Sequence, residues 1–159
     1  VPGWIGLVLA VLMLVRFVFW KPQLALRRID LGIMYLGYLA IATQLVLKLL
    51  DQTIEPAWVG TVSVHVFTLG AMGLVIPAMI VRIAKGHTGR KVAFDSLDKW
   101  VLRIMIVGLM VRTVAPQLHP AWYLHWLHLA ATCWLIGFTV LAWRYVPFLT
   151  QARIDGKEH

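Results

Sequence analysis

Residues 59–83 read VGTVSVHVFTLGAMGLVIPAMIVRI, and the first lysine, arginine or acidic residue in this stretch is Arg82. A helix needs about 20 predominantly apolar residues to cross the hydrocarbon core of a bilayer. A helix on the surface of a water-soluble domain would need a polar face, which this stretch lacks. The stretch therefore predicts a transmembrane helix, and it indicates the class of the whole chain.

Four further apolar runs flank this one, and the five predicted spans cover approximately residues 4–20, 31–50, 59–83, 100–114 and 122–145. Of the 159 residues, 60% are hydrophobic and 14% are charged, whereas soluble domains contain about 25% charged residues. Backbone groups in lipid must be satisfied internally, and no strand-like alternation competes with helices. The sequence predicts an all-α fold: residues 1–159 form a single domain, a polytopic transmembrane helical bundle.

The segments between the runs alternate in charge. Basic residues follow the first, third and fifth runs, whereas the segments after the second and fourth runs are acidic or neutral. Because cytoplasmic loops carry the excess of Lys and Arg, we expect an N-terminus outside and a C-terminus in the cytoplasm. The net charge of +8 is thus assigned to loops beside the lipid bilayer. Nucleic acid is not an expected partner, since no recognition module accompanies the charge.

The central run contains polar and small residues. Because a polar residue inside lipid is energetically costly, we expect each to have a structural or functional role. His65, Met72 and Met79 are seven residues apart, which places them on one face of a regular α-helix. Gly70 and Gly73 would let a neighbouring helix, or a flat cofactor, approach the backbone closely. We expect His65 either to bind a metal, as a neutral imidazole can, or to form a hydrogen bond to a neighbouring helix.

Residues 86–90, Gly-His-Thr-Gly-Arg, follow the central run. Together with Arg82, Lys85 and Arg90, the backbone amides between the two glycines could form an anion-binding turn. Haem propionates and lipid headgroups are the two candidate anions for such a turn.

His125 and His128 open the fifth run and, being three residues apart, lie on the same side of a helix. They could bind one metal or two haems, or they could be solvated residues at the membrane boundary. Cys133 is the single cysteine, so an intramolecular disulfide and covalent c-type haem attachment are excluded. We interpret Cys133 as a small buried hydrophobic residue.

Several motifs of the chain resemble the NnrS family. Two of them are His65-Val-Phe-Thr-Leu-Gly-Ala-Met-Gly73 and Gly86-His-Thr-Gly-Arg90, with Ala78-Met-Ile-Val-Arg82 between them. Two more are Trp143-Arg-Tyr-Val-Pro147 and Arg153-Ile-Asp-Gly156. The family consists of bacterial membrane proteins that contain haem and copper and are associated with nitric oxide metabolism and nitrosative stress. The resemblance covers the whole chain, which would correspond to about the last five helices of a twelve-helix member.

The resemblance implies haem as a cofactor, copper as a second candidate, and a location in the bacterial inner membrane. It makes His65 the first candidate ligand and His87 a ligand or propionate anchor. The predicted cofactor-binding residues are His65, Gly70, Met72, Gly73, Arg82, His87 and Arg90, and the predicted metal ligands are His65, His87, His125 and His128. One position departs from the family: its second span usually carries His-Leu-Gly-Tyr, whereas this chain has Tyr35-Leu-Gly-Tyr38. A metal site that used that histidine would be lost or altered here.

The predicted function is therefore haem binding, with copper as a second possibility, linked to nitric oxide handling or the nitrosative stress response. Two alternatives stay open: an electron-transfer subunit with bis-histidine b-type haem, and a structural subunit of a larger membrane complex. No Walker or HExxH motif is present, and catalytic turnover is not predicted. The bundle could act alone, as a homo-oligomer or within a larger complex. Because Val1 lies in an apolar run, we expect a longer or processed precursor.

Overall fold

The computed structural model of the protein describes residues 3–25 and 28–156. Its helices are α1 (Gly3–Phe19), η1 (Pro22–Ala25), α2 (Ile29–Thr53), α3 (Val62–His65), η2 (Val66–Met72), α4 (Gly73–His87), α5 (Ser96–Thr113), α6 (Ala115–Leu118), η3 (Pro120–Trp122) and α7 (Tyr123–Thr150). No strand occurs among these residues. The all-α class predicted from the sequence is confirmed.

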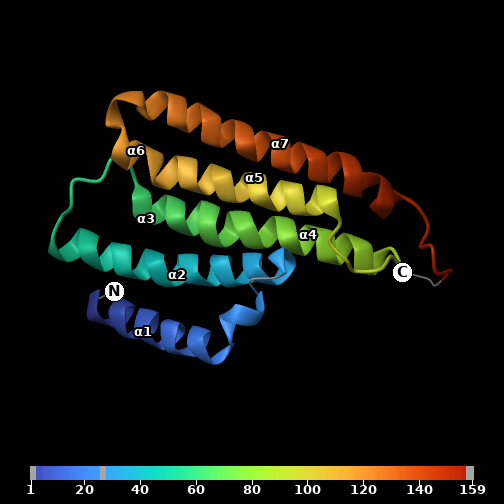
Figure 1. Ribbon diagram of the computed structural model, residues 1–159, viewed down its shortest axis with the longest axis horizontal. Coiled ribbons are helices and arrows are strands. Elements are labelled where there is room, and N and C mark those ends of the chain that lie inside the picture. Colours follow the sequence, from blue (N-terminus) through green and yellow to red (C-terminus); the bar gives the residue numbers. More distant parts are fainter. Residues whose placement is uncertain (1–2, 26–27, 157–159) are drawn as a thin grey trace.

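The long helices lie side by side and alternate in direction (Figure 1). In the middle, α3, η2 and α4 form one continuous rod, Val62–His87. The rod contacts α2, α5 and α7, while α1 packs against α2. Helix α1 begins at one end of the bundle and α7 finishes at the other (Figure 1). We call the end that contains residues 85–98 the basic end, and the opposite end the His65 end.

In the part of the chain that the structure describes, four helical stretches are long and apolar enough to cross a membrane: Ile29–Thr53, Val62–His87, Ser96–Leu118 and Pro120–Thr150. The apolar helix α1 is shorter, at 17 residues, which is close to the lower limit for a membrane span. All five predicted runs therefore form helices, and the predicted membrane bundle is confirmed. Four of the five helices have the full length of a candidate span.

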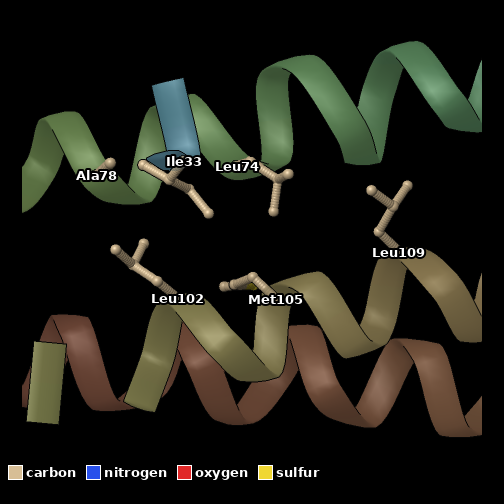
Figure 2. Close-up of a cluster of buried hydrophobic side chains, with 6 residues drawn as sticks. All are labelled: Ile33, Leu74, Ala78, Leu102, Met105 and Leu109. Carbon is tan, nitrogen blue, oxygen red and sulfur yellow. The ribbon is translucent and has the colours of Figure 1, made fainter. Parts of the chain in front are cut away.

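A cluster of buried apolar side chains joins the central helices, and Figure 2 shows it: Ile33, Leu74, Ala78, Leu102, Met105 and Leu109. Helices in lipid gain little from hydrophobic burial, so close van der Waals contact has to hold them together. At Gly37 of α2, a Cβ atom would lie 2.4 Å from Cγ2 of Val75. Glycine at that position therefore allows α2 and the rod to approach each other closely.

The central rod departs from regular α-helical geometry at Val66–Met72, which form a π-helix. Hydrogen bonds in a π-helix reach five residues along the chain instead of four, so the turn is wider. The spacing of seven residues between His65 and Met72 consequently no longer places them on one face. Met72 is 47% exposed, whereas His65 faces Arg112 of α5. The predicted common face was wrong for this pair, because the π-helix changes the register.

Candidate functional site

His65 lies near the start of the central rod, beside two polar side chains. Its Nε2 atom lies 2.8 Å from Nη2 of Arg112 and 3.3 Å from Oγ1 of Thr61. Because a guanidinium can only donate, Nε2 accepts this hydrogen bond and a neutral ring carries its proton on Nδ1. Arg112 also donates to the hydroxyl of Tyr123, at 3.2 Å from each Nη atom. The Nε2 lone pair that could bind a metal is therefore directed at a cation.

The other predicted histidine ligands lie elsewhere in the bundle. His87 ends α4, 22 positions after His65, so about 30 Å of helix separates the two. His125 and His128, near the start of α7, are both exposed, and the His125 ring contacts that of Trp122. Within residues 3–25 and 28–156, no three His, Cys, Asp or Glu side chains are grouped as a metal site requires.

Neighbouring helices occupy the space beside the two glycines of the predicted cofactor motif. A Cβ atom at Gly70 would lie 2.7 Å from Cβ of Ala40, and one at Gly73 would lie 2.2 Å from the ring of Trp134. Of the two expectations, an approaching helix or a flat cofactor, the structure shows the helix at both glycines. Cys133 is buried, as interpreted from the sequence.

The basic end contains a buried polar network that was not predicted from the sequence. Lys85 is 5% exposed and Asp98 is 1% exposed. The Lys85 ammonium donates to Oδ2 of Asp98 at 2.6 Å and to the carbonyl of Ala93 at 2.5 Å. The Tyr145 hydroxyl donates to Oδ1 of Asp98 at 2.5 Å. This network connects α4, α5 and α7 and fixes the segment between α4 and α5.

Asp95 extends that network at the start of α5. Its side chain accepts from the backbone N–H groups of Leu97 and Asp98 and forms a capping box with Asp98. Arg144 of α7 pairs with the Asp95 carboxylate. Partial burial raises the pKa of Asp95, but the hydrogen bonds from Arg144 and from Asp98 N–H, with the charge of Lys85, hold it below its ordinary value. An Asp-x-x-Asp pattern before an apolar run is the sequence signal that could have indicated this cap.

A cavity of about 840 Å³ lies at the basic end, between the end of α1, the start of α2 and the start of α5. Its apolar walls include Phe17, Ile33, Leu36 and Phe94, and its cationic side chains are Arg28, Lys91, Lys99 and Arg103. Tyr35 also lines the cavity, and its hydroxyl donates to the carbonyl of Trp20 at 2.9 Å. The position at which the NnrS motif usually has histidine thus faces the cavity. Its volume is typical of small-molecule sites.

A second pocket of about 490 Å³ lies next to this cavity, and Val92 lines both. The other residues that line this pocket are Arg82, Ile83, Gly86, His87 and Arg153. The predicted anion-binding turn is therefore only partly formed by the residues expected to form it. Arg82 faces the pocket, but Lys85 is directed into the buried network. Arg90 stacks on the ring of Phe148, with 3.8 Å between Cζ and the ring centroid.

Two motifs that are 63 residues or more apart in the chain meet at this pocket. Arg153 donates to the carbonyl of His87 at 3.1 Å, and the N–H of Ile154 donates to the carbonyl of Thr88 at 3.2 Å. Gly89 has a φ of +74°, and a Cβ atom there would lie 2.7 Å from Cγ of Asp155. Only glycine satisfies both conditions. The Gly86–Arg90 turn and the C-terminal segment therefore form one unit.

Comparison with known proteins gives one match. The family model described as NnrS protein matches residues 1–153. No curated protein and no solved structure matches the chain. The family match covers nearly the whole chain and agrees with the helical membrane bundle described above. This protein therefore belongs to the NnrS family.

Proposed function

We propose that this protein binds haem at the basic end of its bundle, in the bacterial inner membrane, and acts in the response to nitric oxide. The observation that carries the proposal is the cavity of about 840 Å³, which combines apolar walls with four cationic side chains and a single carboxylate, Asp30, paired with Arg28. Haem is a flat, largely apolar macrocycle with two carboxylates. A cavity of this size and lining fits both parts of such a ligand.

Two residues are placed to hold the carboxylates: Lys99 and Arg103 are exposed and line the cavity, whereas Arg28 already pairs with Asp30. Tyr35 offers an oxygen ligand from the cavity wall, and tyrosine is an axial ligand to haem iron in some proteins. To act as one, its hydroxyl would release the hydrogen bond to Trp20 and lose its proton. When bound, haem would supply an iron at which nitric oxide can bind.

His65 fits this role less well than the sequence indicated. It lines neither described pocket, and its Nε2 faces Arg112. The bis-histidine alternative finds no support, because His65 and His87 lie at opposite ends of the rod and His125 and His128 are exposed. The proposal concerns haem alone: no three His, Cys, Asp or Glu side chains come together among the described residues.

Titration of haemin into the purified chain in a neutral detergent tests the proposal. We expect a Soret band that saturates and then shifts when nitric oxide is added. A saturable band that ignores nitric oxide would instead support the electron-transfer alternative. The absence of a saturable band would overturn the proposal and favour a structural subunit of a larger membrane complex.

The place of binding is tested with charge reversals. Arg103→Glu should weaken haemin binding about tenfold or more, because a charge-assisted hydrogen bond contributes about 1.5–3 kcal/mol. Lys48→Glu is the matched control, since Lys48 is exposed near the His65 end and lies outside both pockets. Equal weakening by the two variants would show that general electrostatic attraction, rather than the cavity, binds the ligand.

A further inference from the structure

We propose a second binding site on this protein: the pocket formed by Arg82, His87 and Arg153 binds a phosphate-bearing anion. The phosphate could belong to an anionic lipid headgroup or be free in solution, and the experiment below separates the two sources. The proposal does not rest on haem binding, because the pocket lies beside the larger cavity and has its own cationic side chains.

Both arginines of this phosphate pocket are held in position by other contacts. Nη2 of Arg82 donates to the carbonyl and to Oδ2 of Asp30, at 3.2 Å and 3.3 Å. Arg28 also pairs with that carboxylate, at 2.7 Å, so the group of two arginines and one aspartate keeps a positive charge. In addition, the Nε–H of Arg82 is buried without a hydrogen-bond partner among the described residues. Because Nε itself is out of reach, an anion in the pocket would pair with this guanidinium through its Nη groups.

The second arginine is fixed by the C-terminal motif. Arg153 pairs with Asp155 through Nη2 at 2.6 Å and donates from Nη1 to the carbonyl of His87 at 3.1 Å. Nε also donates to Oδ1 of Asp155 at 2.9 Å. These contacts orient the Arg153 guanidinium toward the end of α4, but the pair is neutral overall, so the net positive charge beside the pocket comes from the Arg28–Arg82–Asp30 group. A site whose cations are already oriented loses less conformational entropy when an anion binds.

The end of α4 would normally repel an anion, because the last carbonyls of a helix carry partial negative charge. Here those carbonyls are capped by hydrogen bonds of 2.9–3.2 Å. The capped carbonyls belong to Lys85, Gly86 and His87, and the N–H groups that cap them belong to Arg90, Gly89 and Arg153. The turn thus satisfies these acceptors, and Arg82 and Arg153 line the pocket beside them.

The surroundings of the pocket match a molecule at the membrane boundary. Ile83 and Val92 line it and are each 48% exposed. The pocket lies at the C-terminal end of the candidate span Val62–His87, where lipid headgroups meet water. The basic side chains can therefore bind a phosphate while the two apolar side chains contact the glycerol and the first methylenes of a lipid.

Isothermal titration of the detergent-solubilised chain tests the site with two probes, short-chain phosphatidylglycerol and inorganic phosphate. The double variant Arg82→Gln/Arg153→Gln should weaken binding of the preferred probe about tenfold or more. Lys21→Gln, which removes an exposed charge outside both pockets, should change it less than twofold. Tighter binding of the lipid would identify a headgroup as the source, and tighter binding of inorganic phosphate would identify the free ion.

His87→Glu provides a second test in case the double variant does not fold. It changes an exposed side chain and places a carboxylate at the pocket, so binding should again fall about tenfold while the thermal unfolding midpoint stays unchanged. Two results would overturn the proposal. One is that neither probe binds the wild-type chain saturably, and the other is that Lys21→Gln weakens binding as much as His87→Glu does.

Discussion

The two ends of the bundle stabilise a cation between helices in different ways. At the basic end, Lys85 lies against the carboxylate of Asp98, which also accepts from Tyr145. At the His65 end, Arg112 donates to an imidazole nitrogen and a phenol oxygen. No ion pair of Arg112 with a carboxylate occurs among residues 3–25 and 28–156. One end is therefore held by charge pairs and the other by neutral acceptors.

At the basic end, the side chains that hold the helices together differ from those that line the two pockets. A carboxylate–ammonium pair that is almost fully buried fixes the helices and is costly to break. The cations of this network, Lys85 and Arg144, line neither of the two pockets. At the His65 end, by contrast, Arg112 both connects the helices and covers the imidazole of His65.

The largest effect on stability is expected at Asp98, in the centre of the buried polar network. Asp98→Asn keeps the shape of the side chain but leaves the Lys85 ammonium buried without its main counter-charge. Breaking such a pair costs about 3–5 kcal/mol, and we expect the free energy of unfolding in detergent micelles to fall by that amount. Asp51→Asn near the His65 end, where the carboxylate accepts from the Trp58 indole, should cost less than about 1 kcal/mol.

A double variant sharpens the same test. Lys85→Met/Asp98→Leu removes both charges, and replacing a buried pair by apolar residues is often neutral or stabilising. We therefore expect the double variant to be more stable than Asp98→Asn alone. If the double variant is less stable, the Lys85–Asp98 pair itself contributes net stability to the fold, contrary to this expectation.

An intermediate effect is expected at the His65 end. Arg112→Met removes the hydrogen bonds to His65 and Tyr123 but strands no buried carboxylate, so the free energy of unfolding should fall by about 1–3 kcal/mol. The same change uncovers Nε2 of His65, and we expect its modification by diethyl pyrocarbonate to become faster. Arg103→Met at the basic end should leave that rate unchanged. An unaltered rate in Arg112→Met would mean that Arg112 does not shield the ring.

The smallest effect on stability is expected from the protonation of Asp95 at acid pH. The pKa of Asp95 is held below its ordinary value, after the opposing influence of burial, by Arg144, by Asp98 N–H and by Lys85. A depressed carboxyl pKa contributes stability above the unfolded-state pKa, about 3.9, and that stability is lost as pH falls through the folded-state pKa. Asp95→Asn should therefore reduce stability at pH 7 and flatten its decline below about pH 4. Unfolding midpoints measured between pH 3 and pH 7 would show a parallel shift instead if Asp95 were not involved.

The fold was predictable from the sequence because membrane crossing depends on local composition. The run predicted at residues 31–50 is α2, and the run at 122–145 lies within α7. The π-helix at Val66–Met72 was not predictable, since its residues are ordinary helix-forming apolar ones. That local change was enough to separate His65 from the face of Met72.

The candidate site was predicted only in part, because its contacts are not local. The Gly86–Arg90 turn was recognised, and Arg82 does face a pocket. However, Arg153 reaches that pocket from 66 positions beyond His87, and Tyr145 meets Asp98 across 47 positions. Residue spacing within one helix cannot predict contacts between residues that lie so far apart in the chain. The sequence indicated the turn and the tail separately, and the structure shows that they are one unit.

The Soret spectra of haemin-loaded Tyr35→Phe and His65→Ala, with Tyr38→Phe as the matched control, decide which end of the bundle binds haem. We propose that the basic end, and not the His65 end, provides the haem site. We expect Tyr35→Phe to shift the band or weaken binding, and the other two variants to keep the wild-type spectrum. Loss of the band in His65→Ala, with an unchanged band in Tyr35→Phe, would contradict the claim.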